Sequence, residues 1–297
     1  MTAQAKAGTP FTAALVTMRS ALLPETSLAQ GIALIREAAK QGADYVLTPE
    51  VSNIMQENRK ALFDLLATEE DDKSLKAYRA LAKELNIHLH IGSLALRATP
   101  ERAVNRSFLI GPDGNVLATY DKIHMFDIDL PDGETYRESA NYPAGETAVI
   151  SDLPWGRIGL TICYDMRFPA LYRALAESGA WFLTAPSAFT VRTGEAHWHT
   201  LLRARAIENG CFVFAAAQAG THESKRQSYG HSLIVAPWGE VLAEGGGTET
   251  GVFMAKIDPA KVETARKTVP SLQHGRRFSV ADPKAGPEHL HLVRGSS

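Results

Sequence analysis

Short apolar runs alternate with amphipathic stretches along the first hundred residues of the chain. The run Phe11–Thr17 is too short for a helix and predicts a strand. Residues 27–40 place apolar side chains at helical spacing, and residues 44–48 follow as a second short strand rich in β-forming residues. A further amphipathic helix over 74–85 and a strand over 87–96 repeat this order. The pattern predicts β-α-β units, whose right-handed crossovers bring neighbouring strands together in parallel.

Further along the chain, the pattern also predicts β-hairpins. Three tight turns rich in Pro and Gly each separate two short apolar runs. The predicted hairpins cover residues 106–120, 147–162 and 233–243. Helices are predicted over 169–178 and 195–209, with a strand over 181–184 between them. This mixture predicts an α/β fold in which mixed sheets carry helices on their outer faces, rather than a purely parallel sheet.

Composition and charge narrow the functional classes. The 297 residues are 45% hydrophobic and 22% charged, as in an ordinary globular protein. A formal net charge of −2 gives no long-range field for nucleic acid or for an anionic membrane surface. No apolar run reaches the roughly 18 residues of a membrane span, and the first residues lack the apolar core of a signal peptide. Two cysteines make no disulfide framework, so we expect a cytoplasmic protein without nucleic-acid or membrane partners.

The chain contains no Pro-, Gly- or Ser-rich linker, so we expect a single domain over residues 1–280. The stretch after Lys256 holds several prolines and predicts a loop-rich segment that wraps another surface. Residues 281–297 are predicted to form a flexible C-terminal tail, because chain ends are usually poorly ordered unless other elements hold them.

The segment RIGLTICYDMRFP, residues 157–169, predicts a cysteine at a turn between a strand and a helix. The strand over 158–162 ends at Cys163, and Pro169 is typical of the first turn of a helix. Free N–H groups and the dipole at a helix N-terminus favour a thiolate and can bind an oxyanion. A free cysteine is more often a small buried apolar residue, so the position alone leaves nucleophile and core residue as alternatives.

Two other reactive side chains also follow predicted strands. Glu50 comes after the strand over 44–48, and Lys122 after the second strand of the first hairpin. Loops at the carboxyl ends of strands are where α/β folds collect catalytic groups. A solvated loop glutamate and a protective edge lysine are the plainer alternatives. Residues 121–139 show no clear strand or helix pattern, yet they are too apolar for disorder, so this long loop is expected to be functional.

Three separated motifs carry a resemblance to a known family: TPE at 48–50, YDKIHMFD at 120–127 and ICYDMRFP at 162–169. Together, and in this order, they resemble the nitrilase-like carbon–nitrogen hydrolases, and the resemblance runs from about Phe11 to Phe278. It implies a four-layer α-β-β-α sandwich, in which two mixed sheets pack face to face with helices outside.

The resemblance implies a catalytic triad of Glu50, Lys122 and Cys163, and the chemistry of these side chains agrees with it. Glu50 can take the proton of the thiol, return it to the leaving amine and then activate water. Lys122, together with the backbone N–H of Tyr164, can stabilise the oxyanion that forms when the thiol attacks an amide carbonyl. A second glutamate that often assists in this family falls on Glu138, which would orient Lys122 or position the water.

Several alternatives compete with this interpretation. A cysteine–histidine hydrolase would need a histidine beside the nucleophile, and His124 is the best placed in the sequence. His197 and His199 suggest a metal pair, but residues two apart on a helix point to different faces. The sequence has no HExxH motif or cysteine cluster, so we expect no catalytic metal and no cofactor. Cys211 lies in an apolar run and is expected in the core. A non-catalytic binding module with this fold is a further alternative, but such a module would have lost a triad residue, and all three are present.

Residues 186–232 bear on the substrate. The motifs AFT, AHW, RARAIEN, AAAQ and YGHS in this segment resemble the deaminated glutathione amidases. The related ω-amidases, which act on α-ketoglutaramate, share AHW and GHS, and another small-amide or N-carbamoyl hydrolase of the same family is a further alternative. We expect the substrate-binding residues among Arg167, Phe189, Thr193, His197, Gln218 and Arg226.

Two arginines of this set have alternatives. Arg226, with Lys225, lies in a basic turn that either binds the carboxylate of a large leaving group or is a solvated surface loop. Arg167 either holds substrate or forms a structural ion pair with Asp165 or another neighbour. The resemblance also implies dimerisation through the helix after Cys163 and through the C-terminal part, so we expect a homodimer or a dimer-based oligomer that acts on a small-molecule amide.

Overall fold

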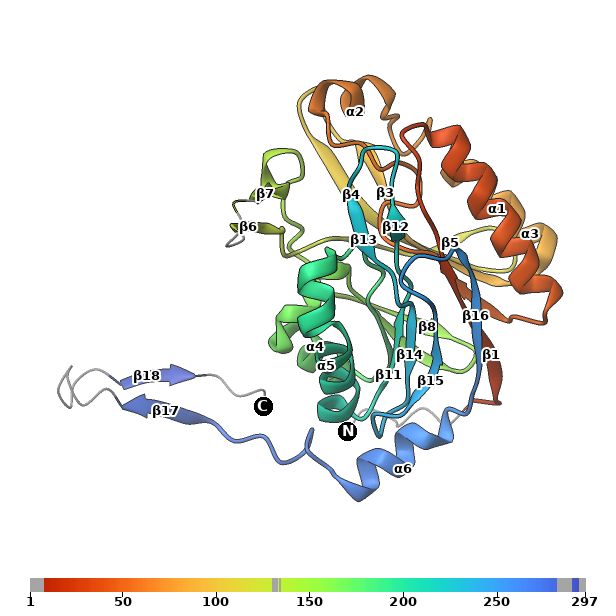
Figure 1. Ribbon diagram of the computed structural model, residues 1–297. Helices are drawn as coiled ribbons and strands as arrows, with labels where there is room; N and C mark the ends of the chain where they lie inside the picture. The colour runs from red at the N-terminus through yellow and green to blue at the C-terminus, as the bar shows by residue number, and fades with distance from the viewer. Residues whose placement is uncertain (1–7, 130–132, 134, 282–289, 294–297) are drawn as a thin grey trace.

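Two six-stranded sheets face each other, and helices cover their outer faces (Figure 1). The structure is a computed structural model and describes residues 8–129, 133, 135–281 and 290–293. Apolar side chains from both sheets meet in one core, which includes Leu15 and Tyr45 of the first sheet and Phe182 and Phe214 of the second. The predicted four-layer α-β-β-α sandwich is therefore confirmed.

The first sheet has the strand order β16-β1-β2-β3-β4-β5. Strands β1, β2 and β3 run parallel, while β16, β4 and β5 are antiparallel to their neighbours. The predicted β-α-β opening is confirmed, because helix α1 connects the parallel pair β1 and β2. The bounds are β1 (Phe11–Thr17), β2 (Tyr45–Leu47), β3 (His88–Arg97), β4 (Ala103–Ile110), β5 (Val116–Asp121) and β16 (Gly251–Ile257).

The second sheet has the order β15-β14-β11-β10-β9-β8. Its central strands β9, β10 and β11 run parallel, and the outer strands are antiparallel to their neighbours. The three predicted hairpins are confirmed as the antiparallel pairs β4–β5, β8–β9 and β14–β15. The bounds are β8 (Val149–Leu153), β9 (Gly156–Leu160), β10 (Ala180–Thr184), β11 (Phe212–Ala215), β14 (Leu233–Val235) and β15 (Val241–Glu244).

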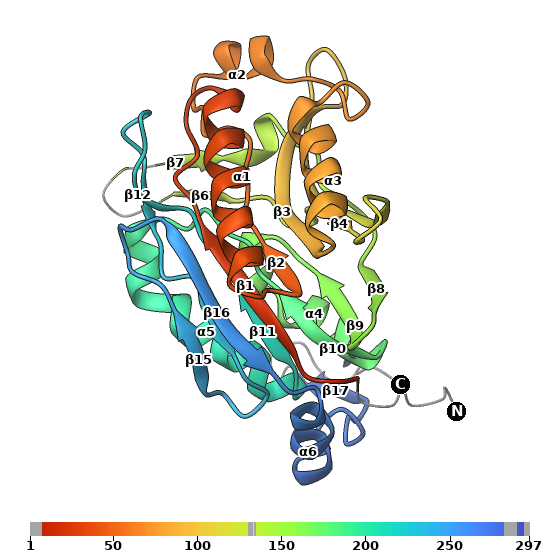
Figure 2. The same ribbon diagram turned by 90° about the vertical axis from the view of Figure 1, so that its right-hand side faces the viewer.

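Helices α1 and α3 pack side by side on the first sheet, as Figure 2 shows, and α4 and α5 pack on the second. The apolar faces of α1 and α3 bury Ile35, Tyr78 and Leu81 against the sheet, as their helical spacing predicts. In the part of the chain that the structure describes, no helix has the length and hydrophobicity to cross a bilayer. The bounds are α1 (Pro24–Lys40), α2 (Arg59–Leu65), α3 (Lys73–Leu85), α4 (Pro169–Glu177), α5 (Val191–Asn209) and α6 (Ala260–Thr268).

Several elements were not predicted from the sequence. Helix α2 is seven residues long, which is too short to show a period. Helix α6 buries only Val262 and Ala265 and lies in the segment predicted to be loop-rich. The long loop after Lys122 contains a small hairpin, β6 (Asp127–Asp129) with β7 (Thr135–Arg137), and the 3-10 helix η1 (Glu138–Ala140). A second small hairpin pairs β12 (Ala219–Thr221) with β13 (Gln227–Tyr229).

Most of the predicted C-terminal tail, residues 282–289 and 294–297, lies outside the described residues. Strand β17 (Phe278–Ala281) ends where the predicted tail begins, and it pairs antiparallel with β18 (Leu290–Val293), which lies within the predicted tail. Both small hairpins of the preceding paragraph lie at the opposite end of the sandwich from α6 (Figure 1).

Candidate active site

Cys163 lies at a sharp turn between β9 and the 3-10 helix η2 (Cys163–Arg167). Its backbone φ of 48° lies in the left-handed region, which non-glycine residues rarely adopt and which costs on the order of 1–3 kcal/mol. The Cys163 N–H donates to the Pro186 carbonyl at 2.9 Å. The turn therefore stops the strand abruptly and presents the buried thiol at the end of the second sheet.

Asp165 holds this turn in place. One carboxylate oxygen accepts hydrogen bonds from the Ile162 N–H at 2.8 Å and from the Tyr120 hydroxyl at 2.7 Å. The other accepts from the His124 N–H at 3.0 Å and lies 2.7 Å from His124 Nδ1. The His124 ring also stacks on Phe168, with 3.5 Å between ring centroids. These contacts occupy His124 in bracing the turn, which disfavours the cysteine–histidine alternative.

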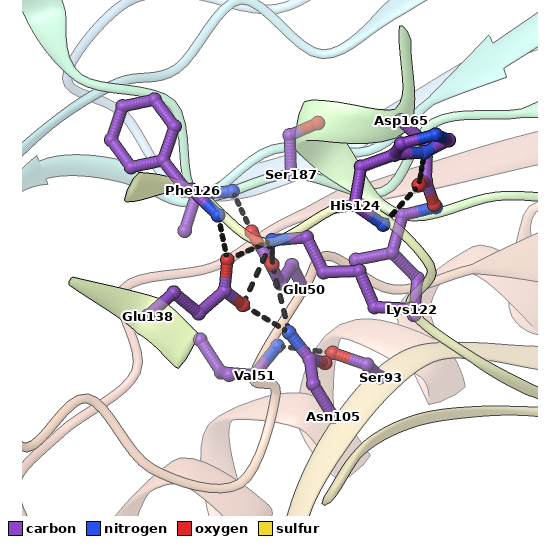
Figure 3. A network of polar contacts seen from close by, with 12 residues as sticks. Glu50, Val51, Ser93, Asn105, Lys122, His124, Phe126, Glu138, Asp165 and Ser187 are labelled. Atoms are coloured by element: carbon purple, nitrogen blue, oxygen red, sulfur yellow. Dashed lines mark hydrogen bonds and ion pairs between the residues drawn. The ribbon is translucent and has the colours of Figure 1, made fainter. Parts of the chain in front are cut away.

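Glu50 follows β2 of the first sheet, and its carboxylate lies against the Lys122 ammonium (Figure 3). Its Oε1 accepts hydrogen bonds from Lys122 Nζ at 2.8 Å and from Asn105 Nδ2 at 3.0 Å. Its Oε2 accepts from the Ala188 N–H at 2.9 Å, and the carboxylate lines the same cavity as Cys163. The buried carboxylate is thus held in place in the cavity that the Cys163 thiol also lines.

Lys122 follows β5 directly, and its ammonium lies between two carboxylates (Figure 3). Nζ is 2.8 Å from Glu50 Oε1, and 2.9 Å and 2.8 Å from the two oxygens of Glu138. Glu138 itself accepts from the Phe126 N–H at 2.7 Å and from Asn105 Nδ2 at 3.2 Å. Because the Lys122 side chain is only 2% exposed, these contacts hold a positive charge at a set position beside the thiol.

Burial and charge set the ionisation of the three groups. Burial would raise the pKa of Glu50, but the Lys122 ammonium holds this pKa below its ordinary value. Burial would lower the pKa of Lys122, but Glu138 and Glu50 hold it well above its ordinary value. Burial and the Glu50 charge raise the pKa of the Cys163 thiol. These directions favour a carboxylate, an ammonium and a neutral thiol in the resting site, which agrees with the predicted role of Glu50 as the base that takes the thiol proton.

The backbone N–H of Tyr164 lies in the first turn of η2, where N–H groups lack partners within the helix. The N–H groups on either side are used, since Cys163 donates to Pro186 and Asp165 donates to the Ile162 carbonyl at 3.1 Å. The Tyr164 N–H therefore stays the predicted oxyanion donor of this turn.

A cavity of about 430 Å³ opens next to the thiol. Glu50, Lys122, Glu138 and Cys163 all line it, so the side chains that the sequence singled out share one space. Aromatic and cationic side chains complete much of the wall, as is typical of sites for small polar molecules. These are Phe126, Tyr136, Tyr142, Phe189, Arg137 and Arg226.

Of the predicted substrate-binding residues, Phe189, Thr193 and Arg226 line the cavity. Arg226 turns inward, donating from Nη2 to the Ala188 carbonyl at 2.8 Å, with Cζ 5.8 Å from the centroid of the Tyr136 ring. Its Nε is buried and has no hydrogen-bond partner among the described residues. The neighbouring Lys225 is exposed, so the basic turn divides into one cavity residue and one surface residue.

Arg167 and His197 contact each other outside the cavity lining, with Arg167 Nη2 3.3 Å from His197 Nδ1. The suggested pair between Arg167 and Asp165 is wrong, because the Asp165 oxygens bind the groups described above. His199 points elsewhere and lies 2.9 Å from Glu244, so His197 and His199 form no metal pair.

Gln218 supports the site from behind. It is fully buried, its Nε2 donates to the Glu50 carbonyl at 2.9 Å and to Ser20 Oγ at 2.7 Å, and its Oε1 accepts from the Ser20 N–H at 2.9 Å. With these bonds made, Gln218 positions the backbone of Glu50 and does not line the cavity. Cys211 is buried, as expected, and its sulfur contacts Arg266 at 3.0 Å.

Sequence reasoning missed Asn105, which joins the two carboxylates by donating to both Glu50 and Glu138. The signal was present, because an asparagine within the apolar strand AVNRSFLI must find partners when it is buried. It also missed Tyr136 and Tyr142, which reach the cavity from a segment without a clear pattern.

Comparisons with known proteins agree with this geometry. Residues 12–267 match the carbon-nitrogen hydrolase family. The chain is 40% identical over 273 residues to a deaminated glutathione amidase of Synechocystis, covering 89% of this chain and 98% of that protein. The crystal structure of Caenorhabditis elegans NitFhit superposes with a TM-score of 0.85 at 37% identity, covering 93% of this chain and 69% of that one.

A third relative carries a chemical modification. A mutant amidase from Nesterenkonia sp. shows covalent addition of the acetamide moiety of fluoroacetamide at its active site cysteine. It superposes with a TM-score of 0.74 at 26% identity, and the match covers 90% of this chain and 97% of that one. The match over most of the chain, the sandwich fold and the arrangement of the site agree: the chain belongs to the carbon–nitrogen hydrolase family, within the nitrilase superfamily, and is a hydrolase of carbon–nitrogen bonds in amides.

Proposed function

We propose that this amidase acts through a Glu50–Lys122–Cys163 triad and that its substrate is deaminated glutathione. The observation that carries the triad is the ion pair of the buried Glu50 carboxylate with the Lys122 ammonium, at 2.8 Å, in a cavity that Cys163 also lines. A base, a cation and a nucleophile from separate elements then surround the point where an amide carbonyl would be attacked.

Acylation follows from these positions. Glu50 takes the thiol proton as Cys163 Sγ attacks the amide carbon, which suits a thiol whose pKa is raised and which is therefore protonated at rest. The carbonyl oxygen becomes an oxyanion between the Lys122 ammonium and the Tyr164 N–H. Glu50 returns the proton to the amine nitrogen, the C–N bond breaks, and a thioester on Cys163 remains.

Deacylation uses the same groups, with water in place of the thiol as the nucleophile. Glu50 takes a proton from water, and the resulting hydroxide adds to the thioester carbon. The second oxyanion occupies the same donors before the C–S bond breaks and Cys163 recovers its proton. Glu138 and Asn105 are positioning residues in this scheme. Glu138 accepts a hydrogen bond from Lys122, and Asn105 donates to both Glu50 and Glu138, so they hold the cation and the base in place.

The substrate proposal rests on the relatives and on the cavity. The Synechocystis relative is named for deaminated glutathione, in which an α-ketoglutaryl group is joined by an amide bond to cysteinylglycine. That leaving group is large and ends in a carboxylate, so it needs space and a cation beyond the scissile bond. Arg226 supports this assignment, because it lines the cavity of about 430 Å³ and its buried Nε has no hydrogen-bond partner among the described residues.

The second candidate is an ω-amidase acting on α-ketoglutaramate, which forms the same thioester but releases ammonia. The two substrates differ in the leaving group alone, so Arg226→Gln separates them. We expect about a 10–100-fold loss of kcat/KM for deaminated glutathione, as for loss of a hydrogen bond between charged groups, and little change for the ketoamide. Lys225→Gln, which changes the exposed neighbour, is the matched control.

The deciding measurement is kcat/KM of the unmodified protein on both amides, a nitrile and an N-carbamoyl compound. The highest value for deaminated glutathione supports the proposal. An equal or higher value for α-ketoglutaramate would assign the protein to the ω-amidases, and a preference for the nitrile or the N-carbamoyl compound would reject both assignments.

We also propose a homodimer or dimer-based oligomer in the cytoplasm, with residues 1–280 as one domain. Exposed large apolar side chains support the assembly, with Ile207, Trp238 and Val269 each more than half exposed. Two buried free cysteines support a reducing compartment. Sedimentation equilibrium of the purified protein tests the assembly, and a monomer at micromolar concentration would contradict it.

A further inference from the structure

Three side chains that can bind metals converge outside the active-site cavity. His199 belongs to α5, His231 precedes β14, and Glu244 ends β15. His199 Nε2 lies 2.9 Å and His231 Nδ1 lies 3.1 Å from the same oxygen, Glu244 Oε1. All three potential ligand atoms lie within 4.8 Å of one another, and none of the three residues lines the cavity beside Cys163.

The backbone around His231 holds its ring toward the other two groups. His231 adopts a φ of 56°, in the left-handed region that non-glycine residues rarely adopt. Its N–H donates to the Gly246 carbonyl at 3.1 Å, and its carbonyl accepts from Trp198 Nε1 at 2.8 Å, directly before His199 on α5. Gly247 leaves room for the ring, because a Cβ at this position would lie 3.0 Å from His231 Nε2.

The two contacts with the shared Glu244 oxygen suit a small divalent ion. Zinc binds histidine nitrogen and carboxylate oxygen at about 2.0–2.2 Å, so ligands of a tetrahedral ion lie about 3.3 Å apart. The observed contacts of 2.9 and 3.1 Å need only a slight opening to reach that value. Two imidazoles and one carboxylate favour zinc and similar transition metals, whereas calcium and magnesium prefer oxygen ligands throughout.

The cluster is accessible to an ion from solvent. Side-chain exposure is 35% for His199, 28% for His231 and 41% for Glu244, which leaves a fourth coordination position open to water. As a plain ion pair, an exposed cluster of this kind contributes little to stability, because water screens the attraction and ordering the side chains costs entropy. Convergence of three ligand atoms from three elements, one of them on a strained backbone, fits metal coordination better.

We propose that His199 Nε2, His231 Nδ1 and the Glu244 carboxylate form a binding site for one Zn²⁺-type divalent ion. The ion would link helix α5 to the outer strands β14 and β15 of the second sheet. It takes no part in amide hydrolysis, so this site stands or falls separately from the proposed triad. A ligand bound to the folded state and not to the unfolded chain stabilises the fold, so the ion raises the melting temperature as its concentration rises.

The test measures metal binding in the full chain carrying Cys163→Ala, which removes the active-site thiol as a competing ligand. Equilibrium dialysis with Zn²⁺ and visible absorption of Co²⁺ give the stoichiometry and the affinity. We expect one ion per chain. Loss of a residue that only hydrogen-bonds a metal ligand costs about 10–100-fold in metal affinity. His231→Gln and Glu244→Gln each remove a ligand itself, so each should weaken binding by more than that.

His197→Gln is the matched control, since His197 lies on the same helix but contacts Arg167. It should bind the ion as the parent does. Each variant is first melted without metal, and a variant that is unfolded is replaced by His199→Gln, which changes the third ligand. No binding at millimolar Zn²⁺, or binding that His231→Gln and Glu244→Gln leave unchanged, would overturn the proposal.

Discussion

Replacing Lys122 by Gln tests the role of the buried ammonium directly. In the protein, Nζ lies 2.8 Å from Glu50 and within 2.9 Å of both oxygens of Glu138, and it is almost completely excluded from water. Gln is shorter and uncharged. The substitution leaves two buried carboxylates facing each other, with Asn105 Nδ2 still bonded to both.

Two consequences for catalysis follow from this geometry. Loss of an oxyanion donor typically costs about 10²–10³-fold in kcat, because the donor acts mainly on the transition state. The base also changes, since Lys122 is what holds the pKa of Glu50 below its ordinary value of 4.5 against the effect of burial. Without it, burial and the Glu138 charge raise this pKa, so more of the base is protonated at a given pH.

The assay is kcat and kcat/KM against pH for the parent and for Lys122→Gln, with Lys60→Gln as control. Lys60 forms an ion pair with Asp64 at 2.7 Å, but its side chain is 86% exposed. We expect a fall of at least about 10² in kcat, a smaller change in KM, and an acid limb of the kcat/KM profile that moves to higher pH. A kcat near that of Lys60→Gln, with an unmoved acid limb, would refute the reasoning.

The same substitution should also destabilise the fold. Breaking a buried ion pair by removing one partner costs about 3–5 kcal/mol. The depressed pKa of Glu50 makes this contribution present above pH 4.5 and lost as the pH falls through the folded-state value. Denaturant unfolding should therefore show the largest gap between parent and variant near neutral pH and a smaller gap in acid. A gap that is constant with pH would contradict the linkage.

Three further outcomes are expected. Rapid quenching with a slow amide substrate should give one acyl adduct, which mass spectrometry locates on the Cys163 peptide; an adduct on Cys211, or turnover by Cys163→Ala, would reject the nucleophile. Gly92→Ala should destabilise the protein by about 1–3 kcal/mol and lower kcat/KM, because a Cβ there would clash with the Thr48 carbonyl, two residues before Glu50. A stability and a kcat/KM like those of the parent would show that β3 and the segment before Glu50 can move apart at no cost. Exhaustive chelation should leave amide hydrolysis intact, whereas activity lost to a chelator and restored by Zn²⁺ would place a metal in the reaction.

Local sequence patterns determined the large elements of this protein. Apolar spacing predicted the crossover helix α1, and turn residues predicted the hairpins β4–β5, β8–β9 and β14–β15. These features depend on residues close together in the sequence, so a single sequence contains the information. Elements with short or weak patterns, such as α2, α6 and the hairpin β6–β7, were missed because their stability comes from tertiary packing rather than from their own periodicity.

The reactive residues could also be identified from the sequence, since Glu50, Lys122 and Cys163 each follow a strand. Their ionisation could not. A helix N-terminus suggested a thiolate at Cys163, but burial and the neighbouring Glu50 charge raise the pKa of the thiol, and these depend on which side chains the two sheets bring together. Likewise, Asn105 binds Glu50 across 55 positions of sequence, and Arg226 reaches the cavity while Lys225 beside it remains exposed. The sequence thus determined which chemical groups are available, whereas the tertiary structure determined their charges and partners, because both depend on burial and on contacts between distant segments.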